Sequence, residues 1–309
     1  MSSTIVGGYQ GRFTVSREST YGIIPSGTYE WIGLVDDAEP AVNTGNINIR
    51  RLGLRDLVSI VKGKRELDFK LQFYMQTSGS GTLASSSFLK NNNMLGNSFG
   101  LWPASTDAGM TGSFTTELFF SRIAPNPNLI FYIPGCKFEE TTIEMRAGDP
   151  TKITTTVWGQ QMFTGSTVSG SVYQADPGTA PFMWYDGAIQ YTPSGGSTQI
   201  LNNVTEARVR IRQSLERVYN IQNNINTIRV LQERGREIDG ELRVNFESFA
   251  ELNELLNDTD FRLDLVFNQA GGVTGSFYNC KWSKDNYPTK PTELISFTVP
   301  FTARSGSLS

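Results

Sequence analysis

Residues 65–73, RELDFKLQF, recur in modified form at residues 236–246, REIDGELRVNF. Each stretch opens with Arg-Glu, an aliphatic residue and Asp, and continues with apolar residues at alternate positions. Alternation with a period of two is typical of a β-strand with one buried face, because successive side chains point to opposite sides of a sheet. The repetition indicates that one β-rich unit occurs twice in the chain.

A second pair of matching stretches lies downstream of the first, in the same order. Residues 131–138, FYIPGCKF, correspond to residues 277–282, FYNCKW, and each is followed by a Thr-containing strand pattern, at residues 151–160 and 293–304. We therefore predict a first β domain at residues 1–165 and a second at residues 182–309. Residues 166–181 are rich in Gly, Ser, Thr and Pro, which is typical of an exposed linker.

The alternation predicts mainly antiparallel strands in both halves. In the first half they are expected near residues 46–51, 65–74, 113–122, 129–138 and 152–158. In the second half they are expected near residues 206–213, 236–246, 261–267, 275–282 and 292–302. A capping box, Ser248 with Glu251, predicts a helix at residues 248–257, and a weaker helix is expected at residues 86–95. The predicted fold is mainly β: two tandem β-sandwich or barrel domains, each with one flanking α-helix.

The composition argues against catalysis. The chain has 309 residues and a net charge of -3, and it contains no histidine. It therefore lacks the usual general base at neutral pH and the commonest metal ligand, and a Ser-His-Asp arrangement is impossible. Cys136 and Cys280 cannot form a zinc site by themselves, and we expect two buried free thiols. We expect no catalytic residue, no cofactor, no metal site and no membrane segment.

One basic cluster has a regular spacing. Arg208, Arg210 and Arg212 alternate with apolar residues, which places all three on one face of a strand. Such a face can meet acidic residues of a neighbouring subunit or a phosphate backbone. We favour the subunit contact.

Three features resemble the tail tube proteins of long-tailed, siphovirus-like viruses. One is the sequence from Glu18 to Gly22, ESTYG, with Pro25. Another is the start of the second copy, WYDGAI, at residues 184–189. The third is the order in each copy of an Arg-Glu strand, a helix and a closing antiparallel set. The resemblance extends from about residue 13 to residue 304.

The resemblance implies a structural protein of the virion tail, assembled in the host cytoplasm into stacked rings that conduct DNA. It implies sandwich or barrel domains of the tail-tube type, and a chain with two copies is expected to form a ring of three that imitates a ring of six. Expected partners are further copies of the chain, the tape measure protein, the tail terminator and passing viral DNA. Residues 78–112 and 214–232 are candidate arms for stacking one ring on the next.

Two sets of carboxylates are candidates for the channel lining, because the members of each set share a strand face. They are Glu66, Asp68, Glu237, Asp239 and Glu241. Two other functions remain open at this point. One is the inner tube of a contractile tail or secretion apparatus, and the other is a two-domain β-sandwich module that binds carbohydrate.

Overall fold

The structure is a computed structural model that describes residues 11–52, 55–75, 112–120, 129–165, 172–173, 180–221, 227–245, 259–267, 273–283 and 296–308. Within these residues the chain is almost entirely β, with one short 3-10 helix, η2 (Trp184–Asp186). No helix among them is long and apolar enough to cross a membrane. The predicted strands are present in both halves, so the mainly β fold class is confirmed.

The N-terminal half contains the strands from β1 to β9. They are β1 (Gly11–Arg17), β2 (Thr28–Trp31), β3 (Leu34–Ala38), β4 (Ala41–Ile49), β5 (Ser59–Tyr74), β6 (Phe114–Phe120), β7 (Leu129–Arg146), β8 (Lys152–Gly159) and β9 (Phe163–Gly165). Antiparallel pairing runs from β1 to β6, β7, β8 and β5, and β5 then pairs with both β3 and β4.

The C-terminal half contains the strands from β11 to β19. They are β11 (Ala188–Pro193), β12 (Gln199–Ile200), β13 (Val204–Arg212), β14 (Leu215–Val218), β15 (Val230–Glu233), β16 (Glu237–Asn245), β17 (Phe261–Phe267), β18 (Val273–Trp282) and β19 (Ser296–Leu308). Pairing runs from β11 to β17, β18, β19, β16 and β13, all antiparallel. The pairing order is the same as in the N-terminal half, with β13 in the place of β3 and β4.

The two halves also agree in local backbone geometry at the matching cysteines. Gly135 and Asn279, one residue before each cysteine, both have positive φ angles, 66° and 48°. The Sγ atoms of Cys136 and Cys280 each contact the carbonyl oxygen three residues earlier, at 3.1 and 3.4 Å. In the first copy this residue lies next to the point at which the strand changes partners, because β7 pairs with β6 as far as Cys136 and with β8 from Lys137 onward.

A strand pair joins the halves. The second edge of β7 pairs with β13 in antiparallel register, from Glu140 opposite Arg212 to Arg146 opposite Glu206. The strands β5, β8, β7, β13, β16 and β19 thus form one continuous sheet, which we call the shared sheet. One face of it packs on a core that extends through both halves, where Leu67, Val209 and Leu242 are fully buried. We call the opposite face the open face.

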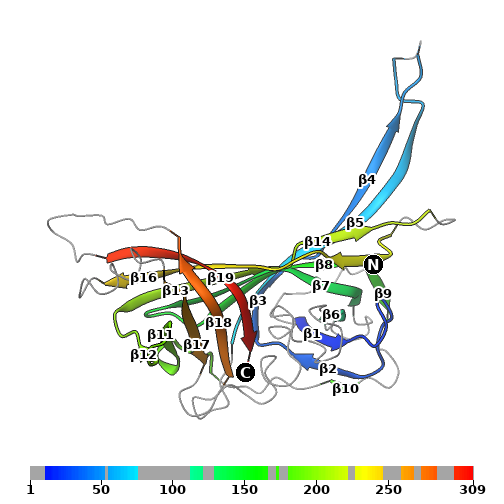
Figure 1. Ribbon diagram of the computed structural model, residues 1–309. Helices are drawn as coiled ribbons and strands as arrows, with labels where there is room; N and C mark the ends of the chain where they lie inside the picture. The colour runs from blue at the N-terminus through cyan, green and yellow to red at the C-terminus, as the bar shows by residue number, and fades with distance from the viewer. Residues whose placement is uncertain are drawn as a thin grey trace.

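A two-stranded arm extends beyond this body. Figure 1 shows the far part of β4 and the beginning of β5 standing out from the body of the molecule as a hairpin. Apolar side chains on it are exposed, with Ile47 57% and Ile60 62% accessible. Strands were expected near residues 46–51 and 65–74, but the sequence does not indicate that this part of the chain projects as an arm.

Some sequence predictions fall outside the described residues. Both expected helices, at residues 86–95 and 248–257, lie there, as does nearly all of the candidate arm at residues 78–112. The expected linker is described only in part. Within it β10 (Val172–Tyr173) pairs in parallel with β2 of the N-terminal half. The second candidate arm, residues 214–232, contains β14 and most of β15, which form a small antiparallel hairpin.

Candidate channel face and subunit interface

The carboxylates predicted to share strand faces lie on the open face of the shared sheet. In β5, Leu67 is buried while Glu66 and Asp68 on either side of it are partly accessible. In β16, Ile238 and Leu242 are buried and the acidic residues alternate with them. The strand registers from β5 through β8, β7 and β13 to β16 place both acidic sets on the same side. The sequence predicted two separate strand faces, and the structure joins them into one.

The three arginines of β13 occupy the middle of that face. The strand β13 lies between β16 and β7. Its residues Ala207, Val209 and Ile211 are fully buried, so Arg208, Arg210 and Arg212 point to the open face. On the β16 side their register partners are Glu241, Asp239 and Glu237. On the β7 side they are Glu144, Thr142 and Glu140. A basic strand therefore lies between two strands with acidic side chains.

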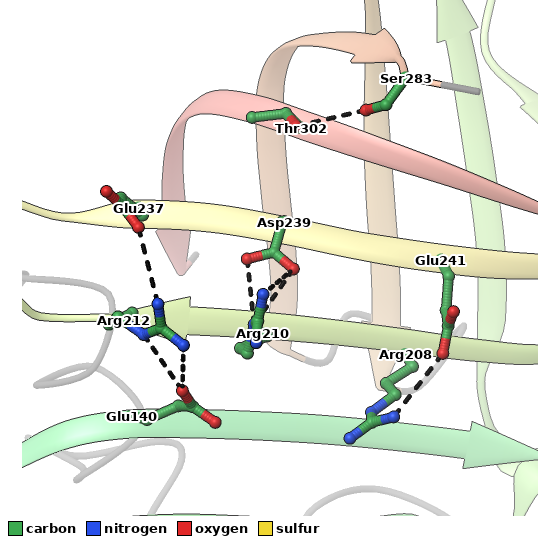
Figure 2. A network of polar contacts seen from close by, with 9 residues as sticks. All are labelled: Glu140, Arg208, Arg210, Arg212, Glu237, Asp239, Glu241, Ser283 and Thr302. Atoms are coloured by element: carbon green, nitrogen blue, oxygen red, sulfur yellow. Dashed lines mark hydrogen bonds and ion pairs between the residues drawn. The ribbon is translucent and has the colours of Figure 1, made fainter.

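These arginines form ion pairs within the chain (Figure 2). Arg210 donates to both carboxylate oxygens of Asp239, at 2.8 to 3.1 Å. Arg212 donates to Glu140 at 3.0 and 3.2 Å and lies 4.0 Å from Glu237, while Arg208 lies 3.7 Å from Glu241. We call this set the charged ladder. Its members are Glu140, Arg208, Arg210, Arg212, Glu237, Asp239 and Glu241.

The pairing affects the protonation of the arginine at the centre of the ladder. The hydrogen bonds with Asp239 raise the pKa of the Arg210 guanidinium above its ordinary value. Arg210 is therefore charged at neutral pH. The predicted contact of these arginines with a neighbouring subunit stays a prediction, but each of them already has an acidic partner within the chain.

The carboxylates of β5 contact the β14–β15 hairpin and remain partly accessible. Arg217 of β14 lies 3.3 Å from Glu66 and 3.8 Å from Asp68, and its guanidinium stacks 3.9 Å above the ring of Trp158. Tyr219 donates a hydrogen bond to Glu66, and burial together with that carboxylate raises the Tyr219 pKa to about 12. A nearly buried ion pair of 2.8 Å between Lys137 and Glu233 fixes the hairpin to β7.

Sequence reasoning missed two members of this arrangement. Glu140 follows Glu139 in the sequence, and adjacent residues of a strand point to opposite faces, so the pair by itself does not indicate a charged site. Its partner Arg212 becomes visible only when β7 is known to pair with β13, a contact between residues 72 positions apart in the chain. Arg217 was missed because one arginine in a loop-like segment has no pattern.

A second polar site surrounds Glu18, whose side chain is buried. Its carboxylate accepts hydrogen bonds from the hydroxyls of Ser113 and Thr115, at 2.6 and 2.7 Å, and from the backbone N–H groups of Gly22 and Gly135, at 2.8 and 2.7 Å. The motif from Glu18 to Gly22 was recognised in the sequence, but its role was not. In the structure it is a turn after β1 whose one buried side chain, Glu18, connects it to β6 and β7.

The described residues hold no candidate metal centre, since no group of three or more Cys, Asp or Glu side chains among them is arranged to bind an ion. Cys136 and Cys280 are buried and free. Burial raises the pKa of the Cys280 thiol to about 12 and moves the Cys136 pKa in the same direction. Among the described residues, what remains of functional interest is surface: the open face, the outer edge of β3 and β4, which pair only with β5 there, and the exposed arm.

A comparison with protein-family models gives a match over residues 8–303 to the model described as "Phage tail tube protein". The chain belongs to the phage tail tube protein family. This tail tube protein is thus a structural component of the virion tail. The family match agrees with the resemblance seen in the sequence and extends over nearly the whole chain.

Three solved structures show some similarity to this tail tube protein. The tail of an empty gene transfer agent particle is 12% identical, with a TM-score of 0.32, over 40% of this chain and 92% of that one. The anti-feeding prophage tube-terminating cap is 12% identical, with a TM-score of 0.35, over 54% and 95% of the two chains. The sheath/tube terminator of an extracellular contractile injection system is also 12% identical, with a TM-score of 0.34, over 54% and 100%. None of the curated proteins compared with the tail tube protein matches its sequence.

Proposed function

We propose that the chain is a tandem duplication that assembles into rings of three, and that these rings stack into the tube of a long, siphovirus-like tail. The tube is a passive conduit through which DNA passes into the host. The protein has no catalytic role. Assembly takes place in the host cytoplasm, with the tape measure protein inside the tube and the tail terminator at its end.

The repeated pairing order supports the duplication. In each half the same succession of six strand positions is hydrogen-bonded in the same antiparallel sense, and a left-handed residue precedes the matching cysteine. Two copies of one domain are expected to share both strand pairing order and local backbone geometry, whereas unrelated β domains seldom agree in both.

The pairing of β7 with β13 is the main observation that supports the proposed ring. It connects one edge of the first copy to the opposite edge of the second copy through seven register pairs, from Glu206 to Arg212. In the first copy, β3 and β4 hold the place that β13 has in the second. Among the described strands these two pair only with β5, so their outer edge is open.

An open edge invites a further strand, because its N–H and C=O groups have no partner within the sheet. A second chain that repeats the β7–β13 geometry would place its second copy against this edge. The repetition has the same direction each time, so it is head-to-tail and closes into a ring. Three chains then supply six similar joins, three within chains and three between them.

The β4–β5 arm is the proposed contact between successive rings. Ile47 and Val61 lie directly opposite each other on one face of the arm, and Ile49 lies on the same face. Exposed apolar side chains in such a row are typical of a surface that another protein covers. Since the arm stands away from the shared sheet, it can contact a neighbouring ring without disturbing the wall of the channel.

Electron microscopy and native mass spectrometry of the purified full-length chain test this proposal. We expect rings whose mass equals three chains and whose projection shows six similar lobes, together with hollow tubes at high concentration. A ring of six chains would contradict the role of the duplication, and persistent monomers under all salt conditions would contradict the function. Copurification with a sheath protein would indicate the inner tube of a contractile tail instead.

A further inference from the structure

We propose that the charged ladder makes the open face non-adhesive to DNA, because carboxylates of the same chain occupy the guanidinium groups of Arg208, Arg210 and Arg212. The inference rests on the proposed function, in which the open face lines the channel. It assigns a specific task to ion pairs that would otherwise be ordinary surface contacts.

The arginines alone would be a phosphate-binding strip. Three guanidinium groups on alternate residues of one strand are all at least 38% accessible to solvent. Arginine binds phosphate in the same bidentate way as it binds carboxylate, and every phosphate contact releases counterions and strengthens binding. Repeated around a ring and along a tube, such strips would hold DNA strongly instead of letting it pass.

The neighbouring strands prevent this. Five carboxylates are in register with the three arginines: Glu237, Asp239 and Glu241 on β16, and Glu140 and Glu144 on β7. The guanidinium group of Arg210 already donates hydrogen bonds to Asp239, and that of Arg212 donates to Glu140. A phosphate approaching either group must displace a carboxylate and also meets the excess negative charge around it.

Strand register alone does not account for these charges. The register of β13 is fixed by the burial of Ala207, Val209 and Ile211, because a shift by one residue would move all three out of the core. Ion pairs between partly exposed side chains add only about 0 to 1 kcal/mol each. Uncharged polar residues such as Thr and Asn would be equally compatible with a solvent-exposed sheet face. The paired charges are therefore better explained by the DNA that passes this face in the proposed channel.

The ladder differs from the equivalent part of the first copy. By strand register, the places of Arg208, Arg210 and Arg212 correspond to Glu39, Ala41 and Asn43 along β5. No basic side chain stands there. Glu66 and Asp68 hold the places of Glu237 and Asp239 in the first copy, so these carboxylates occur in both copies and the arginines opposite them only in the second.

Binding of a short fluorescent DNA duplex to the purified, unassembled chain tests the proposal. We expect very weak binding by the wild type. The variant combining Asp239→Asn with Glu140→Gln removes the carboxylates to which Arg210 and Arg212 donate hydrogen bonds. It should bind at least about tenfold more tightly at low salt, with the log–log salt slope steeper by about 0.9 for each arginine that gains a phosphate contact. Adding Arg210→Gln and Arg212→Gln should return binding to the wild-type level.

A charge-matched control combines Glu216→Gln with Asp149→Asn, which together remove two exposed carboxylates outside the ladder, the partners of Arg234 and Arg146. If this control binds DNA as tightly as the ladder variant, the effect is one of net charge and the proposal is wrong. Strong binding by the wild type would also overturn it. Electron microscopy of the same variants after concentration reports on rings and tubes separately, so a failure of the ladder is distinguishable from a failure of tube assembly. Thermal melting of each variant shows that it is folded.

Discussion

The backbone N–H of Gly135 donates a 2.7 Å hydrogen bond to the buried carboxylate of Glu18, across 117 positions of the chain. This bond ties the turn after β1 to the point at which β7 changes from one strand partner to another. With Ser113, Thr115 and Gly22 the carboxylate has four donors. A buried carboxylate with this many donors is solvated by the protein in place of water.

Replacing Glu18 should therefore destabilise the fold. Glu18→Ala leaves the buried N–H of Gly135 and its fellow donors without an acceptor, and we expect a loss of about 3 kcal/mol in the free energy of unfolding. Glu18→Gln keeps one acceptor oxygen and should lose less. Urea denaturation measures both, with the exposed Glu39→Gln as the matched control. Equal stability of Glu18→Ala and the control would contradict a structural role for the motif.

The two left-handed residues before the cysteines, Gly135 and Asn279, should differ in how much a substitution destabilises the fold. A Cβ at Gly135 would lie 2.8 Å from Cβ of Gln160 and 3.0 Å from Cζ of Tyr21, so Gly135→Ala should cost about 2 kcal/mol or more. Asn279 already carries a side chain at the equivalent place. There Asn279→Ala should cost about 1 kcal/mol and Asn279→Gly about 0.5 kcal/mol at most. Chemical denaturation compares the three variants, and a tolerant Gly135 would contradict this account of the turn.

Both thiols should resist alkylation in the folded protein. Cys136 and Cys280 are fully buried, and burial raises the pKa of each, to about 12 for Cys280. Only the thiolate reacts, so iodoacetamide should label neither residue until denaturant is added. Mass spectrometry counts the labels. The variant Ser283→Cys places a thiol at an exposed position of the open face and should react at once.

Glu30 should make stability depend on pH. It lies opposite the buried Val15, and desolvation raises its pKa above the ordinary value of 4.5. A raised acid pKa favours folding while the group is protonated, and this advantage is lost as the pH rises through the folded-state pKa. Glu30→Gln should therefore raise the melting temperature at neutral pH and leave it unchanged well below pH 4.5. An effect of equal size at both pH values would show that the cause is not ionisation.

The arm should be required for tubes but not for rings. Ile47 and Val61 are 57% and 44% accessible, so changing both to Lys should leave folding nearly unchanged. We expect the double variant to form rings that do not stack, as judged by electron microscopy. Asn48→Lys, on the other face of the arm, is the control and should still form tubes. If the double variant formed normal tubes, the arm would not be the contact between stacked rings.

Much of this fold could be predicted from the alternation of apolar residues. The strand that begins near Arg65 and its counterpart after Arg236 were located within a few residues, because each buries one face and so carries a clear period of two. The arm was missed for the opposite reason. Its side chains are exposed on both faces, as in most of β4, and burial therefore left no pattern in the sequence.

The candidate site was predictable only in part. The shared face of Glu237, Asp239 and Glu241 follows from strand geometry and needs no knowledge of the fold. The pairing of Arg212 with Glu140 depends on the contact between β7 and β13, and the alternation of either strand is the same whichever partner it has. Sequence periodicity reports which way a side chain points but not what stands opposite.

The position of β7 has a consequence for how the chain unfolds. This strand is hydrogen-bonded to β8 along one side and to β13 along the other, so it belongs at once to both halves. Separating them would strip β7 along one edge and open the core that continues beneath it. We therefore expect one cooperative calorimetric transition for the whole chain, not two, and neither half expressed alone should be stable against aggregation.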